Sequence, residues 1–360
     1  MYAMTNAADG NQILIYTQSG DDIPRLNARV STGGRGSGGE LTSPVDALGS
    51  QGSLLLSEDG RWLFAVNAGS DEVSSLEVTS SGLVLRDKVP SGGEFPVSLT
   101  LHGNLLYVLN SGGDGNITGF TVGEAGRLTH LNGSTRSLHA GGTNPPSFLV
   151  SPAQVGFSPA GDKLLVTVKG SNDIHVFTIG VDGLPGARPV TTKSVGTRPF
   201  SFSFDTHGHL LVAELFGSHG VGTPNSGAVT SYKLRPDGRL EVLDASVDNA
   251  QTATCWIAVD GQGRYAYATN NASATISGYR IDEDGHLRLL DDGGVSARLP
   301  PGSAPVDLSV SRDGRFLYTV NAGRGALDAF RIDPDSGHLT PLGEVGGLPV
   351  SDGAVGLAVD

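Results

Sequence analysis

Apolar and polar positions along this chain follow one sequence pattern that repeats. An apolar run reaches a short turn, and a second apolar run follows the turn and ends in Asn. Clear copies occupy residues 54–67, 257–270 and 308–321, and a copy with a shorter turn occupies residues 99–110. A sequence pattern that recurs about every 50 residues indicates one repeat architecture, not a series of unrelated domains.

Each copy continues with two further runs. Residues 174–179 and 276–281 alternate apolar and polar positions, which predicts half-buried strands. A second turn follows, and its Asp-Gly pair, as in Asp284-Gly285, suits the positive φ of a tight hairpin. A fourth short run, such as residues 240–243, ends the unit. Four strands per copy, without a sustained 3.6-residue pattern, predict a β-propeller blade.

The ends of the chain complete the repeat. Diverged copies at residues 155–169 and 202–214 and a half copy at residues 2–6 bring the units to seven. Residues 354–360 resemble a first strand without its continuation, so we expect this strand to pair with the N-terminal strands and remove the free sheet edges. The sequence therefore predicts an all-β fold, a closed seven-bladed β-propeller of four-stranded antiparallel blades, in a single domain of residues 1–360.

Composition narrows the set of partners. With 37 acidic and 24 basic residues the net charge is −13, which disfavours nucleic acid and anionic membranes as partners. No apolar run approaches the roughly 18 residues that span a bilayer. We expect a monomer that acts on a small-molecule substrate, with no nucleic acid and no membrane as partner.

Signals for a cofactor or a compartment are sparse. The single cysteine, Cys255, has no intrachain disulfide partner, and no Cys/His cluster has zinc spacing. We expect Cys255 to be a small packed residue. Residues 1–6 lack the basic and apolar regions of a signal peptide, so none is expected in this sequence. A cytoplasmic and an exported location both stay open.

The longest loops are expected on one face of the propeller. In an antiparallel blade the loop after the second strand and the loop after the fourth strand lie at the same end. The long connections at residues 31–52, 132–154 and 215–228 all belong to these two classes. Long loops on a rigid scaffold commonly carry binding and catalysis. We therefore predict a pocket over the central channel on this face.

The residue that ends the second strand reaches the same face. It is Asn in most copies, at Asn67, Asn110, Asn270 and Asn321, and these amides either bond the turn backbone or contact a ligand. Neighbouring copies have Lys169 and Glu214 instead. These two charges are either surface or ion-paired groups, or an oxyanion stabiliser and a general base at the channel mouth.

The starts of the first strands supply further candidates. They place Gln154, Ser201, Trp256 and Asp307 around the channel, with Arg198 just before one strand. Such residues either line a wet channel or bind a small oxygenated ligand with an anionic or aromatic part. His219, in the loop at residues 215–228, is the histidine expected nearest the mouth, although a loop His is commonly only solvated.

Three tetrapeptides carry a family resemblance. Each follows a Gly turn and precedes a strand, and they are Tyr107-Val108-Leu109-Asn110, Tyr267-Ala268-Thr269-Asn270 and Tyr318-Thr319-Val320-Asn321. The chain resembles the seven-bladed lactonase propellers, of the 6-phosphogluconolactonase and carboxymuconate cyclase type, and also YVTN-repeat propellers. The resemblance covers essentially the full chain. It implies hydrolysis or formation of a lactone ring at the channel mouth without a required metal.

Two motifs of that family are altered in this chain. The family often has paired His before one middle strand, where this chain has Ser151-Pro152-Ala153-Gln154. It often has Pro-Arg-His before the next, where this chain has Pro199-Phe200-Ser201, with Arg198 on the other side of the proline. The Glu-Leu pair of the family is present as Glu214-Leu215.

The leading hypothesis is a lactone hydrolase, or a lactone-forming cyclase, without a cofactor. Glu214 would activate water, Lys169 and Arg198 would hold the carboxylate or oxyanion, and Trp256 would pack on the ring. A lactonase that depends on a divalent cation such as calcium is one alternative, with Glu214, Asp307 and several Asn as ligands. A non-enzymatic binding or scaffold propeller is the other.

Overall fold

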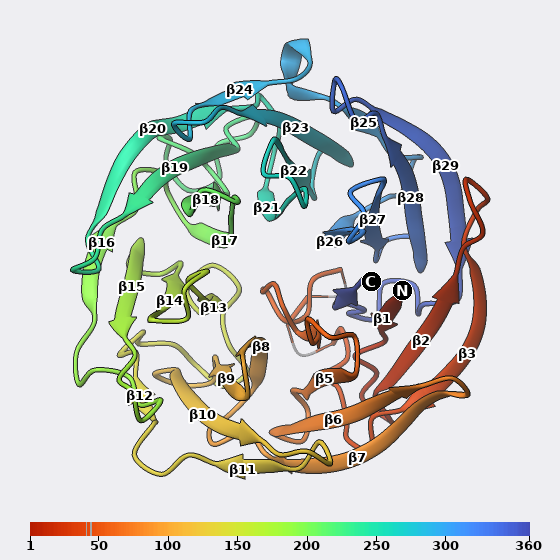
Figure 1. Cartoon of the computed structure of the whole chain (residues 1–360). Coiled ribbons are helices and arrows are strands. Elements are labelled where there is room, and N and C mark those ends of the chain that lie inside the picture. Colours follow the sequence, from red (N-terminus) through yellow and green to blue (C-terminus); the bar gives the residue numbers. More distant parts are fainter. Residues whose placement is uncertain (41, 44) are drawn as a thin grey trace.

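The computed structural model describes residues 1–40, 42–43 and 45–360. In these residues the strands form seven antiparallel sheets, which stand around a common axis as the blades of a propeller (Figure 1). Each blade has four strands along its main path, and two blades carry an additional short strand at the rim. The predicted seven-bladed all-β fold is confirmed.

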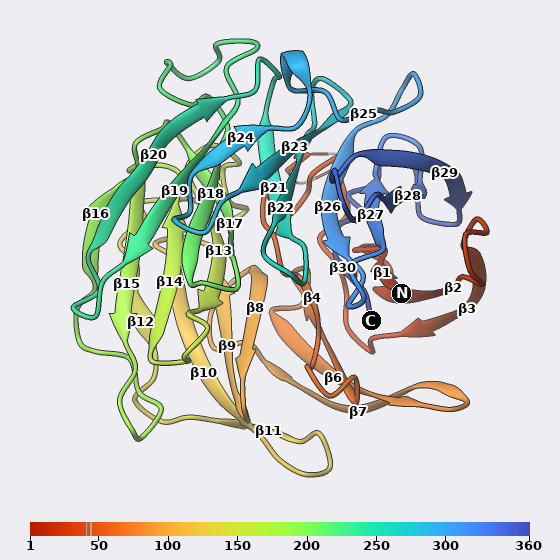
Figure 2. The ribbon, with the colours of Figure 1, turned by 45° about the horizontal axis from the view of Figure 1, so that its top comes forward.

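Blades 2 to 4 follow the chain from the axis outward. Blade 2 contains β4 (Leu54–Leu56), β5 (Trp62–Asn67), β6 (Glu72–Thr79) and β7 (Gly82–Pro90). Blade 3 contains β8 (Pro96–His102), β9 (Leu105–Asn110), β10 (Asn116–Val122), β11 (Leu128–His130) and β12 (Arg136–Ser137). Blade 4 contains β13 (Pro152–Phe157), β14 (Lys163–Val168), β15 (Asp173–Thr178) and β16 (Val190–Lys193), which lie side by side in Figure 2.

Blades 5 to 7 have the same order. Blade 5 contains β17 (Pro199–Phe204), β18 (His209–Glu214), β19 (Ala228–Leu234) and β20 (Leu240–Asp248). Blade 6 contains β21 (Thr254–Val259), β22 (Tyr265–Asn270), β23 (Thr275–Ile281), β24 (Leu287–Leu289) and β25 (Ala297–Arg298). Blade 7 contains β26 (Pro305–Val310), β27 (Phe316–Asn321), β28 (Ala326–Ile332) and β29 (Leu339–Gly346).

Blade 1 joins the two ends of the chain. From the axis outward it contains β30 (Leu357–Ala358), β1 (Tyr2–Met4), β2 (Gln12–Thr17) and β3 (Arg25–Ser31). Ala358 pairs with Tyr2 and Leu357 pairs with Ala3 in an antiparallel register. Figure 1 marks both ends of the chain side by side in this blade. The predicted pairing of the C-terminal strand with the N-terminal strands is confirmed.

Burial explains the apolar runs of the sequence. All residues of the second strands β5, β14, β22 and β27 are buried. Neighbouring blades cover both faces of these strands, so polar positions do not alternate with apolar ones there. The rim strand β20, in contrast, has no buried residue. The apolar signal therefore weakens from the axis to the rim.

The rim differs from the sequence pattern in two places. β20 extends to Asp248, beyond the predicted residues 240–243. The predicted long connection at residues 132–154 is interrupted by β12, which pairs with β10, and β13 already begins at Pro152. Helical structure in the described residues is limited to the 3-10 turn η1 (Asp292–Gly294), and none of their helices is long and apolar enough to cross a membrane.

Candidate functional site

Lys169, Arg198 and Glu214 lie together on the face predicted for them. Lys169 directly follows β14, and Arg198 precedes β17 in the next blade. Glu214 ends β18 and is opposite Pro199 in the strand register. Arg198 Nη1 donates to the carbonyl oxygens of Lys169, at 2.7 Å, and of Gly170, at 2.8 Å. The three predicted catalytic residues are thus neighbours in blades 4 and 5.

Glu214 is fully buried and engaged in hydrogen bonds. Its Oε1 accepts from Ser194 Oγ at 3.0 Å, from the Gly196 N–H at 2.7 Å and from Thr230 Oγ1 at 2.8 Å. Its Oε2 accepts from Ser246 Oγ at 2.9 Å. Burial raises the pKa of the carboxyl, and the four hydrogen bonds oppose that shift. The side chain therefore ties β18 to β19, to β20 and to the loop between β16 and β17.

The recurring Asn residues make the same kind of connection. Asn67 is fully buried, accepts from Thr32 Oγ1 at 2.7 Å and donates to Ser74 Oγ at 2.8 Å. Asn270 is fully buried, accepts from Thr254 Oγ1 at 2.6 Å and donates to Ser277 Oγ at 2.9 Å. Asn110 and Asn321 are also fully buried and bond Ser91 and Ala304, which lie in the loops that enter their blades from the preceding blades. Each amide therefore ties the end of its second strand to the chain that enters the blade.

Lys169 reaches toward the axis instead. Its side chain is fully buried, and its Nζ donates to the Gly49 carbonyl oxygen at 2.6 Å. The ammonium also lies 4.9 Å from the ring centroid of Phe148 and 4.8 Å from that of Phe200, in cation–π geometry. Burial lowers the pKa of Lys169 to about 8, although Asp46 and Cys255 oppose the shift. This is a desolvated cation that holds a carbonyl group.

The mouth of the channel is filled by residues 46–52, here called the channel loop. This loop belongs to the connection between β3 and β4, which Figure 1 shows inside the ring of blades. Trp256 Nε1 donates to the Ser50 carbonyl oxygen at 2.7 Å. The side-chain amide of Gln51 exchanges hydrogen bonds of 2.9 and 3.1 Å with the backbone of Ile257. In this arrangement the pocket predicted over the channel is occupied by the protein's own loop.

The channel loop also brings Asp46, which the sequence analysis missed. Asp46 is 4% exposed, and its Oδ1 accepts from the Gly49 N–H at 2.9 Å. Burial raises its pKa to about 7, and the nearby Lys169 ammonium opposes this shift. The available signal was a lone acid inside the apolar stretch at residues 45–48 of a long loop. That signal does not indicate that the stretch reaches the axis.

The polar residues at the first strands connect neighbouring blades. The Gln154 amide exchanges hydrogen bonds of 3.0 and 2.7 Å with the backbone of Phe202 in the next blade. Ser201 donates to the carbonyl oxygen of Cys255, and Asp307 accepts from the Leu357 N–H at 3.1 Å. First strands of neighbouring blades do not pair with one another, so these side chains satisfy backbone groups that would otherwise lack partners.

A cavity of about 360 Å³ follows the channel below the channel loop. Gln154, Asp307 and Gln51 contribute to its wall, together with residues 202–204 and 257–259. These ranges are the ends of β17 and β21 nearer the first hairpin of each blade, so the cavity lies toward the face opposite Lys169. Burial raises the pKa of Asp307 to about 8, although two backbone N–H groups oppose the shift.

The sequence also matches a family model, described as "Lactonase, 7-bladed beta-propeller", over residues 40–140 and 213–305. The match covers more than half of the chain. This chain belongs to the lactonase family of seven-bladed β-propellers. The resemblance seen in the sequence is thereby confirmed.

Individual relatives of this lactonase-family chain are distant in sequence. The protein of Arthroderma benhamiae named "Probable 6-phosphogluconolactonase" is 23% identical over 304 residues, 79% of this chain and 74% of that protein. The 6-phosphogluconolactonase of Formosa agariphila is 24% identical over 324 residues, 84% of this chain and 87% of that protein. The structure of the Pseudomonas aeruginosa periplasmic gluconolactonase is 21% identical, has a TM-score of 0.71 and covers 98% of this chain and 97% of its own. This last likeness concerns the fold.

Two other residues of this lactonase-family propeller were singled out in the sequence, a loop histidine and the single cysteine. His219 lies in the loop between β18 and β19, with its side chain 49% exposed and Nε2 3.7 Å from Asp248 Oδ2. Cys255 is buried in β21, and burial raises the pKa of its thiol well above the ordinary value. His219 is therefore a solvated loop residue in this structure, and Cys255 is a packed thiol.

The oxygens considered for a divalent cation have partners within the protein. Both oxygens of Glu214 accept hydrogen bonds, and Asp307 accepts the Leu357 N–H. In the described part of the chain, no group of three or more His, Cys, Asp or Glu side chains could hold a metal ion. As placed here, these residues do not fit a calcium site.

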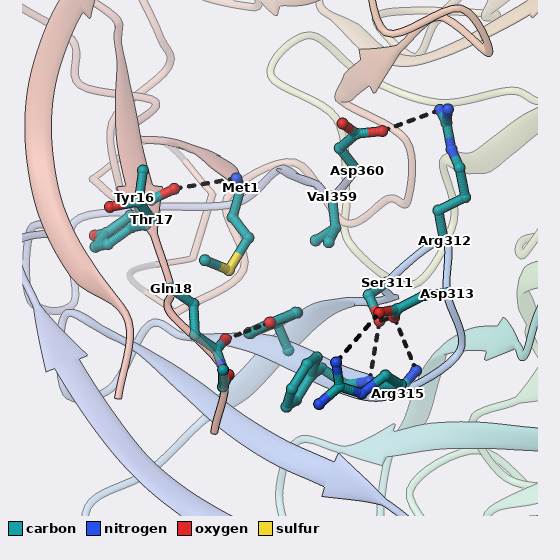
Figure 3. Close-up of a pocket in the computed structure, with 13 residues that line it drawn as sticks. Met1, Tyr16, Thr17, Gln18, Ser311, Arg312, Asp313, Arg315, Val359 and Asp360 are labelled. Atoms are coloured by element: carbon teal, nitrogen blue, oxygen red, sulfur yellow. Dashed lines mark hydrogen bonds and ion pairs between the residues drawn. The ribbon is translucent and has the colours of Figure 1, made fainter. Parts of the chain in front are cut away.

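A separate hollow of about 730 Å³ lies where blade 7 meets blade 1 (Figure 3). Its arginines are paired with acids, since Arg312 Nη2 is 3.2 Å from Asp360 Oδ1 and Arg315 Nη2 is 3.4 Å from Asp21 Oδ1. None of the residues proposed from the sequence lines it. The Lys169 region therefore remains the candidate site of this lactonase-family propeller.

Proposed function

We propose that this protein hydrolyses a small oxygenated lactone on the loop face of the propeller, where Lys169 holds the lactone carbonyl and Arg198 binds an anionic substituent. Membership of the lactonase family supports the reaction class. One observation carries the location: the buried Lys169 ammonium already holds a carbonyl oxygen, that of Gly49, at 2.6 Å. A cation that binds a carbonyl oxygen in desolvated surroundings also stabilises the oxyanion that forms when water attacks.

The substrate would reach Lys169 by displacing the Gly49 carbonyl oxygen at the tip of the channel loop. In this structure the Gly49 carbonyl occupies the position proposed for the lactone carbonyl. The aromatic rings of Phe148, Phe200 and Trp256 surround that position and would contact the carbon skeleton of a small ring. Arg198, which is half-buried, would meet an anionic substituent. Two relatives named for 6-phosphogluconolactone hydrolysis support a sugar lactone as the first substrate to test.

The role of Glu214 as general base stays a prediction. Its carboxylate accepts four hydrogen bonds, and these must rearrange before an oxygen can reach water. The absence of a required metal is likewise a proposal.

The test is proton release in a pH-stat with a panel of sugar, aliphatic and aromatic lactones. We expect wild-type turnover that persists in chelator, and a loss on the order of 100-fold or more in Lys169→Met. Lys163→Met is the matched control, because Lys163 is also buried in blade 4 but pairs with Asp162 at the far end of β14. Wild-type protein that releases no protons from any lactone would overturn the proposal.

The filled channel mouth favours one other candidate, a propeller that binds a partner without chemistry. Residues 49–52 bond to blades 3, 4 and 6 across the axis, so this face presents a loop where an enzyme would present a pocket. Absence of turnover with every lactone, in a protein that is folded by circular dichroism, would favour this candidate.

A further inference from the structure

Two buried polar atoms near Lys169 have no hydrogen-bond partner among the described residues. They are Asp46 Oδ2, which is an acceptor when ionised, and Arg198 Nε, which is a donor. Arg198 donates to the Lys169 carbonyl oxygen, and Asp46 and Lys169 bond the two sides of the Gly49 peptide, so both side chains lie near Lys169. A buried donor or acceptor without a partner is costly, and each one in a native fold calls for an explanation. A water molecule or a substrate oxygen entering this region would satisfy such atoms.

The Gly49 peptide connects Asp46 to Lys169. Its N–H donates to Asp46 Oδ1 at 2.9 Å, and its carbonyl oxygen accepts from Lys169 Nζ at 2.6 Å. The backbone therefore fixes one carboxylate oxygen and leaves the other, Oδ2, without a protein partner. Glu214 differs from Asp46 in this respect, because both of its oxygens accept hydrogen bonds. Between Glu214 and Asp46, Asp46 is the one with an oxygen available for proton transfer.

We propose that Asp46 is the general base of the lactone hydrolysis and that the channel loop carries it to Lys169. This inference rests on the proposed function, because it assigns a role in the same reaction. Asp46 Oδ2 takes a proton from water, and the hydroxide oxygen bonds to the carbonyl carbon while the carbonyl electron pair moves onto the oxygen beside Lys169. The intermediate then breaks its ring C–O bond, and the leaving alkoxide takes the proton from Asp46. Lactone and water give a hydroxy acid, which loses one proton to solvent at neutral pH.

The surroundings of Asp46 set the pH dependence of this step. The groups that interact with it electrostatically are Lys169, Cys255 and Asp307, and Arg198 interacts with Lys169. Burial raises the pKa of Asp46 to about 7 and lowers the pKa of Lys169 to about 8. We expect kcat/KM to rise as Asp46 loses its proton and to fall as Lys169 loses its own. The profile is then a bell with its maximum between these two limbs.

The experiment compares Asp46→Asn with wild type and with Glu40→Gln, a change at an exposed acid in the same connection between β3 and β4. Turnover of the best lactone is followed in the pH-stat from pH 5 to pH 10. We expect Asp46→Asn to lose on the order of 100-fold in kcat/KM together with the acid limb, and Glu40→Gln to match wild type. Added formate should restore part of the turnover of Asp46→Ala, since a small carboxylate can enter the vacated space, but not that of Lys169→Met.

The outcomes separate this inference from the function on which it rests. No turnover by wild type overturns the proposed function and this inference together. Wild-type turnover that Asp46→Asn leaves unchanged in rate and in acid limb overturns the inference alone. If Asp46→Asn does not fold, Asp46→Glu decides: a displaced acid limb supports the assignment, and an acid limb identical to that of wild type overturns it.

Discussion

Replacing Asp307 by Asn is expected to stabilise the fold at neutral pH. Asp307 is buried in β26 between blade 7 and the C-terminal strand, and its partners are backbone N–H groups. Burial raises its pKa from 3.8 to about 8, so the folded protein keeps the proton at pH 7 whereas the unfolded chain loses it. Asn has nearly the shape of the protonated acid and can still accept from the Leu357 N–H.

The magnitude follows from linkage between proton binding and folding. A raised pKa means that the folded state binds more protons than the unfolded state between pH 3.8 and about pH 8, so wild-type stability falls as pH rises through that window. For each pH unit above 3.8 the wild type loses about 1.4 kcal/mol of unfolding free energy, and the loss amounts to as much as about 4 kcal/mol at pH 7. The Asp307→Asn variant lacks this dependence. Its advantage should therefore be absent near pH 4 and largest near pH 8.

Urea unfolding of both proteins at pH 4, 5, 6, 7 and 8 measures this difference. Asp284→Asn serves as control, because Asp284 is exposed in the hairpin between β23 and β24 and its replacement should leave the unfolding free energy nearly unchanged at every pH. A stability difference between wild type and Asp307→Asn that is the same at pH 4 and pH 7 would refute the reasoning. So would a variant that is less stable than wild type at pH 7.

Two further predictions concern the loops on the other face. Glu214→Ala should lower the unfolding free energy by about 3 kcal/mol or more, because it leaves the Gly196 N–H and three hydroxyl groups without their acceptor. Urea unfolding measures this loss, and an unchanged urea midpoint would contradict the prediction. Trp256→Phe removes the hydrogen bond to the Ser50 carbonyl, and the loosened connection should be cleaved faster by trypsin at Arg35. Cleavage of Trp256→Phe at the wild-type rate would argue against a role for this bond in holding the channel loop.

The fold could be predicted from the sequence because burial is periodic along the chain. The second strands, such as β5 and β22, are covered on both faces and end at one structural position, so a continuous apolar run and a final Asn mark each of them. Closure of the propeller was predictable for the same reason, since residues 354–360 carry half of the repeated sequence pattern. The ends of rim strands were not, because a strand such as β20 is half exposed and has little apolar signal.

The candidate site could be predicted only as far as it follows the repeat. Lys169 and Glu214 occupy the repeated position at the end of the second strand, and the register of blade 5 then places Arg198 beside them. Asp46 could not be found in this way. Its position near Lys169 depends on a loop that leaves blade 1 and crosses the axis to blade 4, and no local pattern records where such a loop ends. For the same reason the filling of the channel mouth was not foreseen.

Lys169 and Glu214 replace the repeated Asn because the hydrogen-bond partners around them differ. An Asn amide both donates and accepts, as Asn270 does between Thr254 and Ser277. In blade 5 the four groups around the repeated position all act as donors, so an acceptor-only carboxylate fits there and Glu214 replaces Asn. In blade 4 the partner is a carbonyl oxygen from a distant loop, so a long donor-only side chain fits and Lys169 replaces Asn. The residue at the repeated position therefore follows from the donors and acceptors that surround it, and in blade 4 these place a desolvated cation beside the channel loop.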